Sequence, residues 1–161
     1  HYDDDLVVRF VASCAPTLGK PREALLEDFG IHLIAGLRSD RVRRLLRYGG
    51  IDYEDFLHSL DDLPGRAALA MPDLSLPELE LEEHEPGRFQ LLCRANIVGA
   101  GHVLTGLLRA LADDYGTLAL LEHGGRRDGA EVVHIQLLDH AFSEGRSFDL
   151  TDPSLAVGGA P

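Results

Sequence analysis

The sequence predicts one α+β domain in which helices come first and a small antiparallel sheet, crossed by one long helix, follows. Apolar residues recur at helical spacing through the first half of the chain, and after Pro77 the period changes to the alternation typical of strands. Two turn sequences, Pro86-Gly87 and residues 124–129, each separate a pair of strand-like segments, which indicates antiparallel hairpins. With 161 residues, of which 45% are hydrophobic, the chain can bury a core of ordinary size.

Four helices are predicted in the first half. Carboxylates at Asp3 to Asp5 favour a helix start because they lie at the positive end of the helix dipole. Pro21 suits the first turn of a helix, where its missing N–H costs nothing. The predicted helices cover residues 3–14, 21–37, 40–48 and a segment that begins at Asp52 and contains Pro64. The apolar residues expected on one face of the second helix are Leu25, Leu26, Phe29, Leu33 and Leu37.

The second half is predicted to hold four strands and the long helix. Leucines alternate with acidic residues in the first of these strands, which indicates a half-exposed strand. The predicted order is a strand at 77–85, a strand at 89–93, a helix at about 98–115, and strands at 118–122 and 132–138. Residues 143–161 are rich in Gly, Ser, Pro and Ala and indicate a linker or a frayed tail. The folded domain is therefore predicted to span residues 1–142.

The composition argues against several classes of function. Asp and Glu number 27 against 15 Lys and Arg, and the formal net charge of −12 repels nucleic acid and anionic membrane surfaces. No apolar run is long enough to span a membrane, and no signal peptide is visible. Cys14 and Cys93 are too few for a disulfide framework and fit a reducing, cytoplasmic setting. Because the chain opens at His1 without an initiator Met, we expect it to be a fragment or a processed product.

Pro64 interrupts the fourth predicted helix. A proline inside a helix removes one hydrogen bond and costs about 3 kcal/mol, and the neighbouring Gly65 adds about 1 kcal/mol. We therefore expect this helix to kink or break between Asp62 and Arg66.

Several short motifs follow one another in a set order along the chain. They are Tyr2-Asp3-Asp4-Asp5, the segment 25–30 (Leu-Leu-Glu-Asp-Phe-Gly), Leu60-Asp61-Asp62-Leu63, Pro77, and Gly106-Leu107-Leu108. Together they resemble the H-NOX family, the haem nitric oxide/oxygen-binding domains, over about residues 2–142 and from the family's third or fourth helix onward. The resemblance implies an H-NOX-like fold and a sensory or regulatory domain that signals to a cyclase, a kinase or a diguanylate cyclase.

The resemblance also places the family's haem contacts on residues of this chain. Pro64 stands where the family carries the histidine that ligates haem iron, and a proline side chain has no ligand atom. Pro77 stands where the family's proline presses on the haem plane. Two distal-pocket positions fall on Leu33 and Val103, which are both apolar.

The family's Tyr-x-Ser-x-Arg clamp grips the haem propionates, because a guanidinium and two hydroxyls match paired carboxylates. In this chain the clamp falls on Cys93, Ala95 and Ile97, none of which can grip a carboxylate in this way. The resemblance therefore implies a degenerate haem site, with haem absent or bound atypically.

Three residues are candidates for a substitute iron ligand, since thiolate and imidazole both ligate haem iron. They are Cys93, His58 and His102, and each also has an ordinary interpretation as a structural or surface residue. Three functions stay open. The first is a regulatory module without haem, or with another hydrophobic ligand; the second is a haem-binding NO sensor with a non-standard ligand; the third is a structural dimerisation module.

Five arginines lie within residues 38–47 of this acidic chain. They balance the acidic surface, or they dock an acidic partner such as a second copy of the domain. The chain has no Gly-rich phosphate loop, no Gly-x-Ser-x-Gly motif and no Cys-x-x-Cys motif, so no catalytic activity is predicted.

Overall fold

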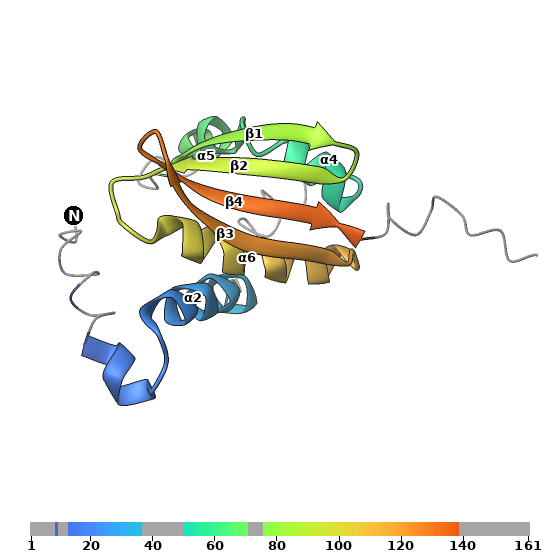
Figure 1. Cartoon of the computed structure of the whole chain (residues 1–161). Helices are drawn as coiled ribbons and strands as arrows, with labels where there is room; N and C mark the ends of the chain where they lie inside the picture. The colour runs from blue at the N-terminus through green and yellow to red at the C-terminus, as the bar shows by residue number, and fades with distance from the viewer. Residues whose placement is uncertain (1–8, 10–12, 37–49, 71–75, 139–161) are drawn as a thin grey trace, which may run out of the picture.

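The computed structural model describes residues 9, 13–36, 50–70 and 76–138 (Figure 1). A helical segment over residues 13–18 precedes the named elements. These are α2 (Arg22–Gly36), α4 (Tyr53–His58), α5 (Leu63–Ala70), β1 (Glu78–Glu85), β2 (Arg88–Arg94), α6 (Ala100–Tyr115), β3 (Ala119–Arg127) and β4 (Ala130–Leu137). The predicted helix at 3–14, the basic helix at 40–48 and the tail at 143–161 lie wholly or mostly outside the described residues. None of the described helices is both long and apolar enough to cross a membrane.

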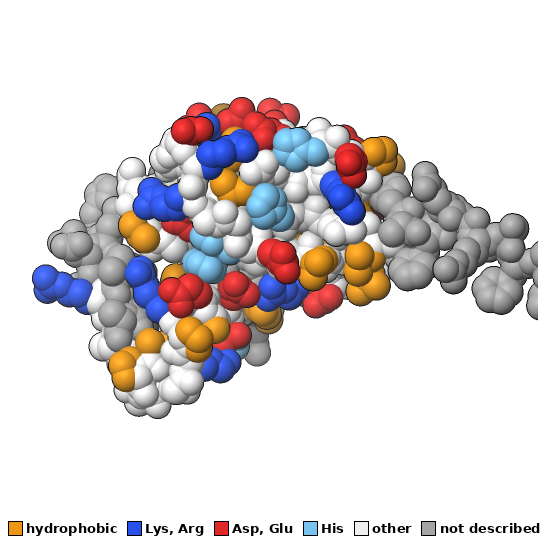
Figure 2. Space-filling view, viewed as in Figure 1, with side chains coloured by type: hydrophobic (Ala, Val, Ile, Leu, Met, Phe, Trp, Pro, Cys, Tyr) orange, Lys and Arg blue, Asp and Glu red, His pale blue; other side chains and the backbone are white. Residues whose placement is uncertain are grey.

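The strands form one antiparallel sheet in the order β1-β2-β4-β3. Helix α6 crosses one face of this sheet, and α2 packs on the far side of α6 (Figure 1). The predicted α+β architecture is therefore confirmed. Acidic side chains gather over β1, whose sequence is Glu-Leu-Glu-Leu-Glu-Glu-His-Glu (Figure 2).

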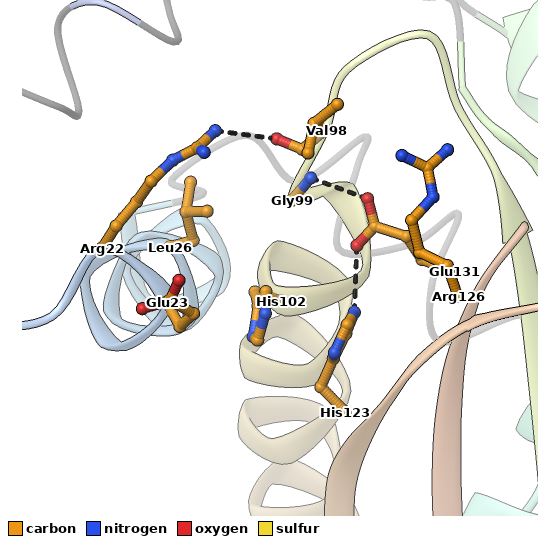
Figure 3. Close-up of a pocket in the computed structure, with 9 residues that line it drawn as sticks. All are labelled: Arg22, Glu23, Leu26, Val98, Gly99, His102, His123, Arg126 and Glu131. Atoms are coloured by element: carbon orange, nitrogen blue, oxygen red, sulfur yellow. Dashed lines mark hydrogen bonds and ion pairs between the residues drawn. The ribbon is translucent and has the colours of Figure 1, made fainter.

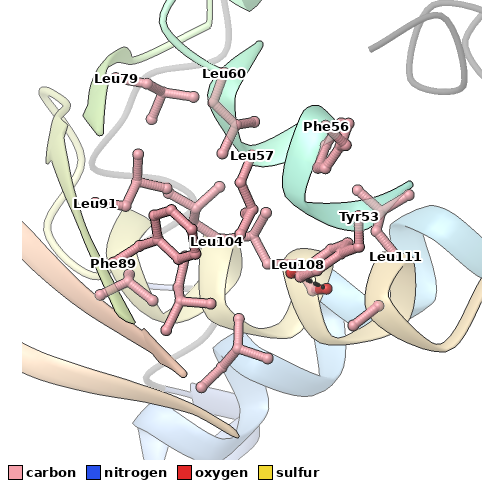
Figure 4. Packing of buried hydrophobic residues seen from close by; sticks show 14 of the residues in the cluster. Tyr53, Phe56, Leu57, Leu60, Leu79, Phe89, Leu91, Leu104, Leu108 and Leu111 are labelled. Carbon is pink, nitrogen blue, oxygen red and sulfur yellow. Dashed lines mark hydrogen bonds between the residues drawn. The ribbon is translucent and has the colours of Figure 1, made fainter. Parts of the chain in front are cut away.

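One large core joins α4 and α5 to the sheet and to α6 (Figure 4). Phe56 and Leu57 of α4 and Leu108 of α6 are completely buried in it. The hydroxyl of Tyr53 donates a 3.0 Å hydrogen bond to the carbonyl of Leu108, and this bond ties α4 to α6 inside the core. Burying side chains of this size stabilises the fold by about 1.5–3 kcal/mol each.

The predicted break at Pro64 lies at a different place. Helix α4 ends at His58, a turn covers residues 59–62, and α5 begins at Leu63. The helix is therefore interrupted before the proline is reached. Pro64 consequently sits in the first turn of α5, where a missing N–H leaves no acceptor unsatisfied. The Asp61 carboxylate accepts a 2.8 Å hydrogen bond from the main chain of Leu81, which anchors the turn to β1.

The predicted polar loop at 124–129 is wrong. Strand β3 continues through both glycines to Arg127, and a bulge between His123 and Arg126 absorbs the extra residues. The hairpin then turns on two residues with positive φ, Asp128 at 51° and Gly129 at 84°. Two positive φ values are the mark of a two-residue hairpin turn whose twist matches the strands.

Candidate functional site

Helices α2 and α6 cross at two glycines. Gly30 of α2 lies against the main chain of α6 at Val103, and Gly106 of α6 lies against the main chain of α2 at Glu27. A methyl group at either glycine would overlap a carbonyl oxygen of the opposite helix. Val103 is half-buried at this crossing, and Leu33, three residues after Gly30, remains 38% exposed.

The other predicted positions lie near β1, β2 and the loop that follows β2. Cys93 is fully buried in β2 and belongs to the main core, and the half-buried Ala95 packs against the same core. Ile97 is half-buried in the loop that leads to α6. Pro64 is half-buried in α5, and Pro77 is half-buried just before β1, the strand against which α5 packs.

Cys93 is poorly suited to act as a ligand. Burial, with a further contribution from the negative charge of Glu131, raises the pKa of the Cys93 thiol to about 11. The group is therefore a neutral thiol at pH 7, whereas metal ligation requires the thiolate.

Each of the two candidate histidines faces a glutamate through one ring nitrogen. The Nε2 atom of His58 lies 3.7 Å from Glu83, and its ring meets Phe89 edge-on at 5.5 Å. The Nδ1 atom of His102 lies 3.4 Å from the Glu27 carboxylate. The two histidines thus lie in different parts of the molecule, His58 beside β1 and β2 and His102 between α2 and α6.

The most heavily hydrogen-bonded polar group near these positions is Glu131 of β4, which is 5% exposed (Figure 3). Its carboxylate accepts hydrogen bonds from the main-chain N–H of Gly99 at 2.7 Å and of Gly101 at 2.9 Å, and contacts Nε2 of His123 at 3.0 Å. Gly99 is the N-cap of α6 and has no side chain to cap it, so a distant strand supplies the cap. Burial alone raises the pKa of Glu131, but the bonds from Gly99, His123 and Gly101 outweigh burial and lower it.

A hollow of about 120 Å³ lies beside this carboxylate, between α2, the start of α6 and the β3–β4 hairpin (Figure 3). We call it the polar hollow. The rings of His102 and His123 stack in its wall, 3.8 Å apart and 18° from parallel. Its lining residues are Arg22, Glu23, Leu26, Val98, Gly99, His102, His123, Arg126 and Glu131.

The sequence model of the haem-NO-binding family matches residues 1–123. The chain belongs to the haem-NO-binding family. The guanylate cyclase soluble subunit beta-2 of Rattus norvegicus is 28% identical over 93 residues, which cover 58% of this chain and 14% of that protein. The chain thus spans about a seventh of this relative's length.

Structures of haem-NO-binding (H-NOX) proteins share the fold at low identity. An H-NOX protein from S. oneidensis in the Fe(II)NO state is 17% identical with a TM-score of 0.72, over 85% of this chain and 77% of that one. The Fe(II) unliganded H-NOX protein from K. algicida is 17% identical with a TM-score of 0.70, over 85% and 74%. These matches confirm the predicted H-NOX-like fold.

The structure groups the predicted family positions in two places. Val103 lies at the crossing of α2 and α6, with Leu33 on α2 three residues after Gly30, and Pro64, Pro77 and Cys93 lie around α5, β1 and β2. Among the described residues, no group of three or more His, Cys, Asp or Glu side chains is arranged to hold a metal ion.

Sequence reasoning did not identify Glu131 or His123. Glu131 stands between Ala130 and Val132-Val133, and a lone acid in an otherwise apolar strand is the one local signal of a buried, bonded carboxylate. Its partner Gly99 is 32 residues away in the chain, a separation that no periodicity reveals.

Proposed function

We propose that this chain is a sensory or regulatory member of the haem-NO-binding family that works without a haem held by an iron ligand. The observation that carries the proposal is Pro64, which stands where the family's iron-ligating histidine is expected and has no atom that can bind iron. Of the candidates for a substitute, Cys93 is a neutral buried thiol, and His58 and His102 lie in different parts of the molecule, each with one ring nitrogen facing a glutamate.

The region of the expected clamp supports the same proposal. Ala95 and Ile97 carry no hydrogen-bonding side chain, and Cys93 is the β-sheet partner of Glu131. Directly paired residues of antiparallel strands project to the same face of the sheet, so Glu131 contributes a fixed negative charge beside this position. A propionate brought there would meet repulsion from Glu131 in place of an arginine. The residues present therefore do not fit a haem held in the family's way.

We further propose that the chain controls a separate output and is not itself catalytic. The rat relative is a guanylate cyclase subunit, and a cyclase, a kinase or a diguanylate cyclase is the output class we assign to this chain. In this role the fold either binds a hydrophobic molecule other than haem or acts as an assembly partner.

A haemin titration followed by absorbance between about 350 and 600 nm tests the proposal, because ligated haem has an intense Soret band that shifts with its axial ligand. We expect no saturable shift with the wild-type protein, and the same result with Cys93→Ala, His58→Ala and His102→Ala. A saturable shift that one of these variants abolishes would contradict the proposal and identify the substitute ligand. Adding a hydrophobic dye to the haem-free protein separates the remaining outcomes, since dye binding indicates an apolar ligand site and its absence a purely structural module.

A further inference from the structure

The hydrogen bonds of His123 define which of its ring nitrogens carries the proton. The main-chain N–H of Gly125 points at Nδ1 over 3.2 Å, and a backbone N–H can only donate, so Nδ1 is an acceptor. The proton of the neutral ring is consequently on Nε2, which donates to the Glu131 carboxylate at 3.0 Å. The ring therefore holds two elements at once, Glu131 of β4 through Nε2 and the bulge of β3 through Nδ1.

Gly125 lies within the irregular part of β3, where the register shifts between His123 and Arg126. Its φ of 84° is a left-handed conformation that glycine adopts readily. Arg126, the next residue, lines the polar hollow, and its guanidinium donates a 3.4 Å hydrogen bond to the carbonyl of Gly129 in the hairpin turn. The bond from Gly125 to the ring thus helps to set where Arg126 lies.

We propose that His123 is a proton-sensitive latch on the β3–β4 hairpin. Protonation places a hydrogen on Nδ1, which then faces the N–H of Gly125 donor to donor, so this bond is lost and the bulge rearranges. The bond to Glu131 survives, because Nε2 remains a donor and the partner remains a carboxylate. Histidine side chains in general change charge between about pH 5 and 8, which sets the range over which the opening of the latch is tested.

Charged groups of the neighbouring elements contact the two stacked rings, line the hollow beside them or pair with a group that does, and they bias where the proton binds. They are Glu131 from β4, His102 and Arg109 from α6, Arg22, Glu23 and Glu27 from α2, and Arg126 from β3. The stacked ring of His102 is the competing site, since it has its own carboxylate in Glu27. Only a proton on His123 opens the latch, so the two stacked rings have to be followed separately.

The test is an NMR titration from pH 8 to pH 5 that follows the Gly125 amide together with the ring signals of His123 and His102. We expect the Gly125 amide proton to move upfield with the midpoint of the His123 ring. We expect its protection from solvent exchange, corrected for the intrinsic rate, to fall roughly tenfold, the equivalent of one hydrogen bond. A Gly125 amide that stays constant while the His123 ring titrates would overturn the proposal, as would a His123 ring that does not titrate in this range.

A substitution separates the latch from general effects of pH. His123→Gln keeps an oxygen to accept from Gly125 and an NH₂ group to donate to Glu131, but it takes up no proton. Its Gly125 signal should be flat with pH, whereas His32→Gln, at an exposed position of α2, should retain the wild-type response. An unchanged pH response in His123→Gln would overturn the proposal. If this variant fails to fold, the wild-type titration decides by itself.

Discussion

Removing the carboxylate of Glu131 should destabilise the protein more than removing any exposed acid. The side chain is buried, and its two oxygens serve two main-chain N–H groups and one imidazole at 2.7 to 3.0 Å. Each hydrogen bond to a charged group contributes about 1.5–3 kcal/mol, and truncation leaves the donors of Gly99 and Gly101 buried without an acceptor. Part of this loss is recovered by water in the adjacent hollow, so we expect Glu131→Ala to lower the free energy of unfolding by about 3–5 kcal/mol.

Urea denaturation followed by circular dichroism at pH 7 measures this difference, with Glu83→Ala as the control. Glu83 is exposed and lies 3.7 Å from His58, so its loss should cost less than about 1 kcal/mol. Glu131→Gln keeps one acceptor oxygen and should fall between the two. Equal losses in Glu131→Ala and Glu83→Ala would refute the assignment of Glu131 as the cap of α6.

The stabilisation that the Glu131 carboxylate provides depends on pH, and the sign of this dependence is defined. The pKa of Glu131 is lowered in the folded protein, so the unfolded chain binds the proton first as the pH falls. The stabilisation from the carboxylate is therefore complete above the unfolded pKa of about 4.3 and is lost as the pH falls through the lower folded value. The difference in the free energy of unfolding between the wild-type protein and Glu131→Gln should have its full value at pH 6 and should become smaller below about pH 4.

Three further predictions follow from the packing. Gly106→Ala should lower the free energy of unfolding by more than about 2 kcal/mol in the same urea assay, because the added methyl group meets the main chain of α2. The control is Gly65→Ala, which should be neutral or stabilising because the space around Gly65 is open. Pro64→Ala should change stability by less than about 1 kcal/mol, since the proline is in a first turn; a gain near 3 kcal/mol would show that it strains a helix interior. In a Cys14→Ser background, a thiol-reactive disulfide reagent at pH 8 should label Cys93 only after denaturation. The Cys93 thiol is buried, and with a pKa of about 11 only about one thiol in a thousand is ionised at this pH. Rapid labelling of the native protein would show that the thiol is accessible and ionised.

Periodic features of the chain could be predicted from the sequence because their causes are local. The alternation along β1 and the apolar repeat of α6 each record which side of an element meets the core. The turn at Pro86-Gly87 was also predictable from local sequence. Glycine readily adopts the positive φ that the turn requires, and Gly87 has a φ of 74°. Together these local signals were enough to predict the α+β order of elements.

Features that depend on distant partners could not be predicted in the same way. The sequence predicts a turn over residues 124–129, yet Gly124 and Gly125 form a bulge within β3 that pairing with β4 stabilises. The turn at 59–62 is anchored by the bond from Leu81 to Asp61, so its position depends on β1. The N-terminus of α6 is capped by Glu131 of β4, and no residue near Gly99 in the sequence indicates this cap.

We propose that this member of the haem-NO-binding family carries no iron-ligated haem, and the haem content of the expressed protein is the decisive test. The measurement is the molar ratio of haem to protein, by the pyridine haemochrome absorbance, after purification from cells grown with excess haem precursor. We expect a ratio near zero for the wild-type protein. A ratio near one, with a Soret band typical of ligated iron, would contradict it.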